Sequence, residues 1–218
     1  MTASALSIAP APLAIADVLR AAILSGSLAA GTRINQDRVA AEHGISHIPV
    51  REALRCLEAE GLVTFAPRRG FFVAKLSAGD AAELGEMRAA LEALAIRLAI
   101  PRLTAADLDS AATAIEAAER SAELAAWSRA NWRFHRSLYA PCARPRLLDT
   151  LEGLWCGADR YLRVVWQAAD WQGRSQKEHR AILRACRRGE TERAAELTRR
   201  HVMAATSALV AVLAEEAE

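Results

Sequence analysis

Two short helix signals joined by the turn "GIS" are the strongest constraint on the fold of the N-terminal part of this chain. The segment 35–43 is predicted to be a helix with Asn35 as its N-cap, and Gly44 follows as a C-terminal glycine cap. The stretch "SHIPVREALRCLEAEGLV" predicts a second helix over 46–60. Pro49 is tolerated there because the N–H groups of the first turn have no intrahelical acceptor, so the N–H that proline lacks is not needed. Two helices joined by so short a turn are typical of a helix-turn-helix.

A third helix and a hairpin complete this part of the chain. Apolar periodicity predicts a helix from Leu13 to Ser25. The stretch "LVTFAPRRGFFVAKL" places β-forming residues on both sides of a Pro-Arg-Arg-Gly turn, which predicts a two-stranded ribbon. Three helices and such a ribbon make a winged helix-turn-helix, expected over residues 1–76.

The remainder, residues 77–218, is expected to be an all-α, six-helix antiparallel bundle, so the whole chain is predicted to be mostly α. It is rich in alanine, and prolines and Gly189 interrupt its apolar periodicity. All five tryptophans lie here and are expected in the core or in a dimer contact. The predicted helices are 80–99, 104–120, 123–139, 145–169, 174–188 and 190–215.

Composition narrows the class of protein and leaves its partner open. Of the 218 residues, 52 % are hydrophobic and 25 % are charged, as in soluble globular proteins. No apolar run is long enough to span a membrane, and the N-terminus lacks the basic region of a signal peptide, so a cytoplasmic location is expected. The net charge of +2 is too small to identify nucleic acid as a partner.

The helix over 46–60 has one apolar face and one face suited to DNA. His47, Arg51 and Arg55 recur at four-residue spacing opposite the apolar stripe, and a bidentate arginine–guanine contact is the commonest specific contact with a base. The alternative is an ordinary amphipathic helix with a solvated charged face. Arg68 and Arg69 at the tip of the hairpin favour DNA, because a wing carries cations to phosphates or to a minor groove.

The stretch "INQDRVAAEHGISHIPVREALRCLEAEGLV", followed by "RRGFFV", resembles the N-terminal domain of GntR-family bacterial transcription regulators. The resemblance implies that the residues matching Ser46, His47, Ile48 and Arg51 touch DNA, together with the wing tip. The chain departs from the family pattern at His47, where arginine is usual. The full set of candidate DNA contacts is Arg38, Ser46, His47, Ile48, Arg51, Arg55, Arg68, Arg69 and Gly70.

Three histidines of the helical part are expected to converge. Asn131 and His135 lie four residues apart and share one helix face. His179 precedes Glu190 by 11 residues and His201 follows it by 11, so in an antiparallel hairpin both lie about 16 Å from the turn. Imidazoles at one level on neighbouring helices, with a pair from a third helix, form metal sites in bundles. The alternative is three unrelated structural histidines.

The motifs "FHRSL" and "EHRAIL" and the late histidine are similar to the FCD effector domain of the FadR branch, in its six-helix, VanR-like form. The resemblance implies a divalent transition metal, with zinc expected first and nickel or another ion as alternatives. Its ligands would be His135, His179, His201 and Asn131, where an aspartate is common. Arg88 matches an arginine that faces the effector pocket, although an exposed pair with Glu92 is an equal alternative. Arg160 and Tyr161 are weaker effector candidates.

These observations predict a ligand-responsive DNA-binding transcription regulator, expected to act as a repressor and not as an enzyme. Its expected partners are double-stranded DNA with a pseudo-palindromic operator, a small carboxylate effector and a second copy of the chain. One alternative is a metal-dependent hydrolase or lyase that uses the three histidines, but no carboxylate is placed by motif as a general base. Another is a metal-free, constitutive DNA-binding dimer.

Overall fold

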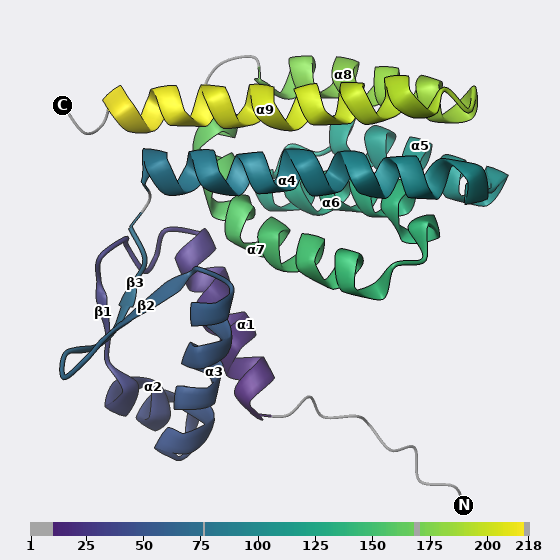
Figure 1. Ribbon diagram of the computed structural model, residues 1–218. Coiled ribbons are helices and arrows are strands. Elements are labelled where there is room, and N and C mark those ends of the chain that lie inside the picture. The colour runs from purple at the N-terminus through teal and green to yellow at the C-terminus, as the bar shows by residue number, and fades with distance from the viewer. Residues whose placement is uncertain (1–10, 76, 168–170, 216–218) are drawn as a thin grey trace, which may run out of the picture. The chain divides into compact units, whose positions relative to one another are not determined.

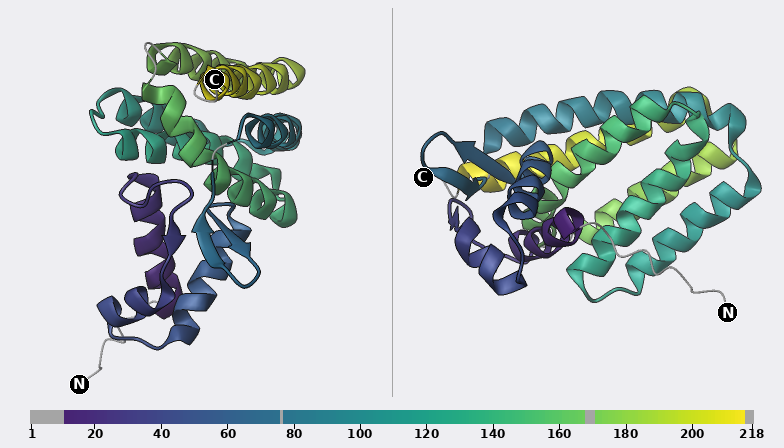
Figure 2. Two further views of the ribbon diagram at one scale, coloured as in Figure 1. Left: turned by 90° about the vertical axis from the view of Figure 1, so that its left-hand side faces the viewer. Right: turned by 90° about the horizontal axis from the view of Figure 1, so that it is seen from below.

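The computed structural model describes residues 11–75, 77–167 and 171–215, and for residues 160 and 162–167 it describes the backbone alone. The chain forms two compact units, Met1–Lys75 and Leu76–Glu218. Figure 1 and Figure 2 show helices and a small sheet in the first unit and stacked helices in the second. Across the described residues, none of the helices has the length and apolarity that a membrane span requires.

The first unit is a winged helix-turn-helix. Apolar side chains from its three helices and from the sheet pack into one core, in which Leu54 and Leu57 of the third helix are fully buried. The sheet is antiparallel with the strand order β1-β3-β2, and Val63 lies opposite Val73. The elements are α1 (Ala11–Leu24), β1 (Arg33–Ile34), α2 (Gln36–His43), α3 (His47–Ala59), β2 (Val63–Ala66) and β3 (Gly70–Val73).

Local signals in the sequence set the ends of the two central helices. The side chain of Asn35 accepts a hydrogen bond from the backbone N–H of Arg38 and caps α2, and Gly44 ends that helix with a left-handed φ of 62°. Pro49 lies in the first turn of α3, where it removes no helical hydrogen bond. The geometry that joins α2 to α3 is therefore the one that these residues favour.

The sheet has one strand more than the predicted ribbon. Arg33 and Ile34 form β1 and pair with Phe72 and Phe71 of β3, so the wing is the outer hairpin of a three-stranded sheet. A strand of two residues is too short to show the alternation that identifies a strand in a sequence. The segment before α2 therefore supplies the edge strand opposite β2.

The second unit contains six α-helices in its described residues, and with the first unit this confirms the predicted mostly α fold class. Two 3-10 turns, η1 (Ile100–Arg102) and η2 (Ala140–Cys142), follow α4 and α6 and contain Pro101 and Pro141, whereas Pro145 begins the next helix. Thr104 and Asp107 form a reciprocal capping box that begins α5. The helices are α4 (Ala78–Ala99), α5 (Ala105–Glu119), α6 (Leu124–Tyr139), α7 (Pro145–Gln167), α8 (Trp171–Arg187) and α9 (Thr191–Glu215).

Helices α4 and α9 lie side by side along their lengths and pack through small residues (Figure 1). Gly85 of α4 faces Thr206 of α9 so closely that a Cβ on the glycine would lie 2.7 Å from the Cβ of the threonine. Ala89 and Ala93 continue the same face of α4 and are buried. This close approach carries α4 deep into the unit, so that even its polar residues Arg88 and Glu92 are buried.

Candidate metal centre and nucleic-acid interface

The first turns of α3 present a mixed polar and apolar surface to solvent. Ser46, His47, Ile48 and Arg51 are all exposed, and Ile48 is 70 % exposed. Ser46 is the N-cap of α3, yet its hydroxyl makes no capping hydrogen bond. The helix therefore offers a hydroxyl, an imidazole, an aliphatic side chain and a guanidinium, a set that suits both phosphates and base edges.

Arg55, the third member of the predicted row, packs against the wing. Its Nη1 donates a hydrogen bond to Glu58 Oε2 at 2.6 Å, and its Cζ lies 4.6 Å from the centre of the Phe65 ring. Four residues correspond to 400° along a helix, so the row drifts around α3 and Arg55 ends beside the sheet. Arg55 thus braces α3 against β2, whereas Arg51 remains open to solvent.

Two further candidates, Arg38 and His47, lie beside acidic side chains. Arg38 Nε is 3.4 Å from Glu42 Oε1, and His47 Nδ1 is 3.4 Å from Asp37 Oδ1. All four side chains are largely exposed, so water screens the attraction within each pair and the pairs are weak. The basic groups therefore stay accessible to a phosphate.

The wing tip is a tight turn with two exposed arginines. Arg68 has a left-handed φ of 63°, and Gly70 has a φ of 93°. The N–H of Arg69 donates to the carbonyl of Ala66 at 3.0 Å, which closes the turn. The turn holds the two cations next to each other at the end of the hairpin.

In the helical unit, three imidazoles from three helices meet in the buried interior. His135 (α6), His179 (α8) and His201 (α9) are 1 %, 1 % and 7 % exposed, and one ligand nitrogen from each lies within 4.8 Å of the others. The Nε2 atoms of His179 and His201 are 3.1 Å apart. Two ligands on a tetrahedral zinc ion, each about 2.0–2.1 Å from the metal, would be separated by about 3.3 Å. The spacing is thus close to that of a ligand pair.

The outer nitrogen of each imidazole already has a partner. His135 Nδ1 is 2.8 Å from the hydroxyl of Tyr139, and His201 Nδ1 is 2.8 Å from Glu178 Oε2. A longer contact of 3.4 Å joins His179 Nδ1 to Oε1 of Gln176. A carboxylate only accepts hydrogen bonds, so Nδ1 of His201 donates to Glu178, and in the neutral form of His201 the lone pair lies on Nε2. This arrangement is the one that orients imidazoles around a metal.

Burial keeps the imidazoles of His135 and His179 in the neutral form. The pKa of His135 lies well below 6.5, mainly because the side chain is buried and also because His179, His201 and Arg88 are near. The pKa of His179 is lowered well below 6.5 by burial and then by His201. A metal ion binds neutral imidazole, so no proton needs to leave these two ligands at neutral pH.

Among the four buried polar atoms that lack a hydrogen-bond partner in the described residues, two on α6 could bind a cation. Nε2 of His135 and Oδ1 of Asn131 are buried, and neither has a hydrogen-bond partner among the described residues. Both belong to α6, one turn apart. Buried polar atoms normally find a partner, and a cation with nitrogen and oxygen ligands would satisfy both. The donor set of three imidazoles and one amide oxygen therefore fits a divalent transition metal.

Arg88 takes part in a buried network that leads to the cluster. Its Nε lies 2.9 Å from Glu92 Oε1, and its Cζ lies 4.2 Å from the centre of the Trp155 ring. The other oxygen of Glu92 accepts a hydrogen bond from Tyr139, whose oxygen also contacts His135. The pair with Glu92 considered from the sequence is present, but it is buried and not exposed, because α4 packs against α9 and α7 at this level.

The remaining effector candidates lie on α7. The hydroxyl of Tyr161 donates to Asp80 and accepts from the backbone N–H of Ser77, so it ties α7 to the start of α4. Tyr161 also lines a cavity of about 10 Å³ beside Arg88, which is room for about one water molecule. The side chain of Arg160 lies outside the described residues.

Sequence reasoning did not find the residues that surround the ligands. These residues share buried or half-buried positions next to an imidazole or to Arg88. Two of them could have been predicted from their spacing to a histidine in the sequence. Tyr139 follows His135 by one helical turn, and Glu178 directly precedes His179. Contacts between different helices could not be derived in that way. The residues that were missed are Tyr139, Trp155, Gln176 and Glu178.

A winged helix-turn-helix followed by a helical unit with a buried polar centre defines a DNA-binding regulator with a separate helical domain. Residues 13–73 match the family of bacterial regulatory proteins called the gntR family, and residues 83–204 match the FCD domain. The chain belongs to the GntR family of transcriptional regulators, in the group that carries an FCD domain.

Named relatives agree with this membership. The HTH-type transcriptional repressor GlaR of Escherichia coli strain K12 is 29 % identical, over 83 % of this chain and 87 % of its own. The Nta operon transcriptional regulator of Aminobacter aminovorans is 33 % identical, over 68 % and 70 %. Both names describe transcriptional regulators, and the matched gntR family is one of regulatory proteins, in agreement with the prediction of a regulator and not an enzyme.

Solved structures show the same architecture. A GntR-family transcriptional regulator from Pseudomonas syringae pv. tomato strain DC3000 has a TM-score of 0.60 at 35 % identity and covers 94 % of this chain and 87 % of its own. Escherichia coli McbR/YncC has a TM-score of 0.77 at 22 % identity, covers 97 % and 100 %, and supports the fold alone.

Proposed function

We propose that this regulator is a homodimeric repressor whose helical domain, residues 77–218, binds one divalent transition metal ion and a small organic acid. Zinc is the first expectation for the metal. The observation that carries the proposal is the convergence of three buried imidazoles whose outer nitrogens are already engaged. With their Nδ1 atoms held by neighbours, the Nε2 atoms are left to bind a common ion.

The ion would be held by His135, His179 and His201, with the amide oxygen of Asn131 as a fourth donor. A bound divalent metal supplies a Lewis acid with room for a further anionic ligand. Asn131 is neutral where an aspartate would carry a negative charge, so the site is one unit more positive than with a carboxylate. That charge favours an anionic effector.

Arg88 is the second anchor of the proposed effector. Its guanidinium suits a carboxylate, but Glu92 already binds it at 2.8–2.9 Å. An incoming carboxylate would therefore compete with Glu92 for Arg88. The adjoining cavity of about 10 Å³ is too small for an organic acid, so binding also requires the side chains around Arg88 to move. Such a movement is what an effector needs in order to favour one conformation over another.

An exposed apolar stripe on α4 supports the homodimer. Met87 and Leu94 are each 42 % exposed, and Leu91 and Leu98 lie half-buried between and beyond them. The spacing of four, three and four residues is that of a helix–helix seam. A stripe of this kind is self-complementary across a twofold axis, so a second copy of α4 fits it.

In the proposed dimer, two copies of the domain 1–76 read a pseudo-palindromic operator. The first turns of α3, with Ser46, His47, Ile48 and Arg51, would enter the major groove. Arg38, Arg55 and the wing residues Arg68, Arg69 and Gly70 would contact the backbone or an adjacent groove.

Elemental analysis of the purified, untagged protein, prepared without added metal, tests the metal centre. We expect about one transition metal ion per chain, loss of that ion in His179→Ala/His201→Ala, and tighter binding in Asn131→Asp. If wild type and Asn131→Asp both stay metal-free after incubation with zinc or nickel, the metal proposal is wrong, and the metal-free dimer remains.

The effector is tested separately on metal-loaded protein. Acetate, succinate and citrate are added in turn, and operator affinity is measured with a duplex selected from random sequences. We expect at least one of these acids to weaken binding in wild type and not in Arg88→Gln/Glu92→Gln, which keeps the site neutral. Equal responses in both proteins would exclude Arg88 as an anchor.

A further inference from the structure

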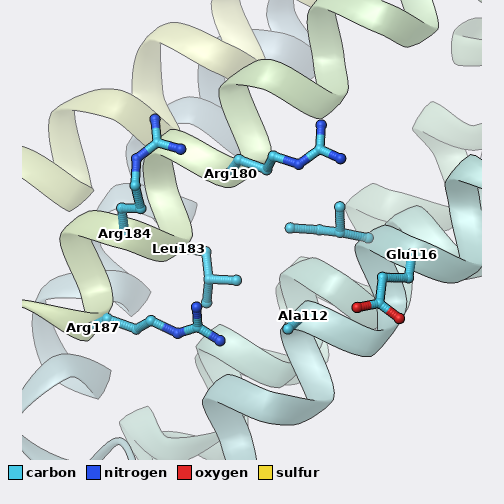
Figure 3. Close-up of a pocket in the computed structure, with 7 residues that line it drawn as sticks. Ala112, Glu116, Arg180, Leu183, Arg184 and Arg187 are labelled. Atoms are coloured by element: carbon cyan, nitrogen blue, oxygen red, sulfur yellow. The ribbon is translucent and has the colours of Figure 1, made fainter.

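A hollow on the surface of the helical unit lies between α5 and α8, away from the histidines. Its volume is about 350 Å³. Figure 3 shows Arg180, Arg184 and Arg187 of α8 spread around Leu183, with Ala112 and Glu116 of α5 on the opposite side. This space, called here the α5–α8 groove, takes no part in the metal centre or in the DNA-binding surface.

The arginines of the groove form a line of positive charge. Arg180, Arg184 and Arg187 are exposed and recur at intervals of four and three residues, so they span about 10 Å along one face of α8. Arg180 is paired with Glu119 across the groove. Arg184 and Arg187 form no ion pair with any residue that the structure describes. Two guanidiniums are thus free to bind a negatively charged partner.

The floor of the groove is apolar. Leu183 and Ile115 belong to the main core of the helical unit and form its outer edge, and Ala112 is half-buried beside them. Glu116, the acidic residue among those that line the groove, lies 3.6 Å from Arg120, as Glu119 beside it is paired with Arg180. The groove therefore combines an apolar base with a basic wall, and a partner must satisfy both.

We propose that the α5–α8 groove docks an acidic amphipathic helix of a partner protein. Carboxylates at helical spacing would pair with Arg180, Arg184 and Arg187, and apolar side chains would lie over Ala112 and Leu183. A helix in a groove matches a line of charge about 10 Å long, whereas a single small anion could reach only neighbouring guanidiniums. A DNA backbone would match the charge but would press phosphates against the apolar base.

A fluorescein-labelled peptide with glutamates at intervals of four and three residues and leucines on the adjoining face tests this docking. Its binding is followed by fluorescence anisotropy, beside a scrambled peptide of the same composition. We expect Arg184→Glu/Arg187→Glu to weaken binding by at least about tenfold. Ala112→Glu, which adds a carboxylate to the floor and leaves the arginines in place, should also weaken it.

The matched control is Arg133→Glu/Arg136→Glu on α6, which changes the same charge at the same spacing on an exposed face outside the groove. It should bind the peptide like wild type, and circular dichroism should show that all variants are folded. Equal binding of the scrambled peptide, or an equal loss in the control, would reduce the effect to net charge and overturn the proposal. A peptide that does not bind, with random-sequence DNA binding weakened by Arg184→Glu/Arg187→Glu, would make the groove a DNA contact instead.

Discussion

The hydroxyl of Tyr139 lies 2.8 Å from Nδ1 of His135, one turn earlier on the same helix. Its single proton goes to the carboxylate of Glu92, so the tyrosine oxygen must accept the proton of His135 Nδ1. The lone pair of His135 is thereby left on Nε2, which has no other partner among the described residues. One residue from outside the ligand set thus determines which nitrogen of His135 can bind a metal.

Tyr139→Phe should weaken metal binding about 10–100-fold, because the orienting partner of His135 is lost while every ligand remains. Competition with a chromophoric chelator measures the change. Tyr161→Phe is the control, since it removes the other tyrosine hydroxyl of the chain at a buried position that contacts Asp80 and no imidazole. Equal metal affinity in Tyr139→Phe and wild type would show that Tyr139 does not orient the site.

Arg88→Met should destabilise the helical unit by about 3–5 kcal/mol, because the carboxylate of Glu92 would stay buried without its ion pair. Arg88→Met/Glu92→Gln should recover most of that loss, since no charge is then left in the interior. Chemical unfolding followed by tryptophan fluorescence reports on this unit, which contains all five tryptophans. A double variant as unstable as Arg88→Met would mean that packing against Trp155, and not the charge, determines the loss.

Gly85→Ala should destabilise the same unit by about 1–3 kcal/mol, because the new methyl group would press against Thr206 and force α4 and α9 apart. Gly153→Ala on α7 is the matched control. Nothing lies within 4 Å of a Cβ at that position, so alanine should stabilise the helix by about 0.5–1 kcal/mol. Similar melting temperatures for the two variants would contradict the close packing of α4 on α9.

Acidification below about pH 6.5 should destabilise the metal-free helical unit. The pKa values of His135 and His179 lie well below 6.5 in the folded chain, so between those values and 6.5 the unfolded chain binds more protons. The stabilisation is complete above about pH 6.5 and is lost as the pH falls. His43→Asn, at an exposed position in the first unit, should keep this dependence. A free energy of unfolding that stays constant down to about pH 5 would contradict it.

Arg51→Ala should weaken binding to a selected operator by about 1–3 kcal/mol and relax its preference at one base pair. Arg69→Ala should lower the affinity for specific and random duplexes alike and reduce the salt dependence by about one phosphate contact. Fluorescence anisotropy at several salt concentrations separates the two effects. If Arg51→Ala lowered both affinities equally, Arg51 would be a backbone contact.

The sequence predicted the helices of this protein closely, because capping residues, glycines and prolines lie at their ends. Asn35 and Gly44 define α2, and Thr104 begins α5. Strand β1 escaped prediction because two residues show no alternation. The convergence of His179 with His201 followed from equal distances to one turn, a property of any antiparallel helix pair.

The contacts around the proposed metal ligands could not be predicted from the sequence for a different reason. Arg88 and Glu92 stand four residues apart, a spacing that an exposed helix and a buried helix share. Their burial depends on the small residues of α4, which let α9 approach. The role of Tyr139 depends in turn on Glu92, which comes from another helix. Contacts of this kind require the packed structure.

Helix α4 is continuous from Ala78 to Ala99 and follows β3 after only the four residues 74–77. It carries Arg88 on its inner side and Met87 and Leu94 on its outer side. A helix is stiff, so α4 rotates as one rigid body. In the proposed dimer joined along α4, a ligand at Arg88 that rotates this helix would change the angle between the two α4 helices. Because only four residues connect α4 to β3, the same rotation would also change the spacing of the two recognition helices along the DNA.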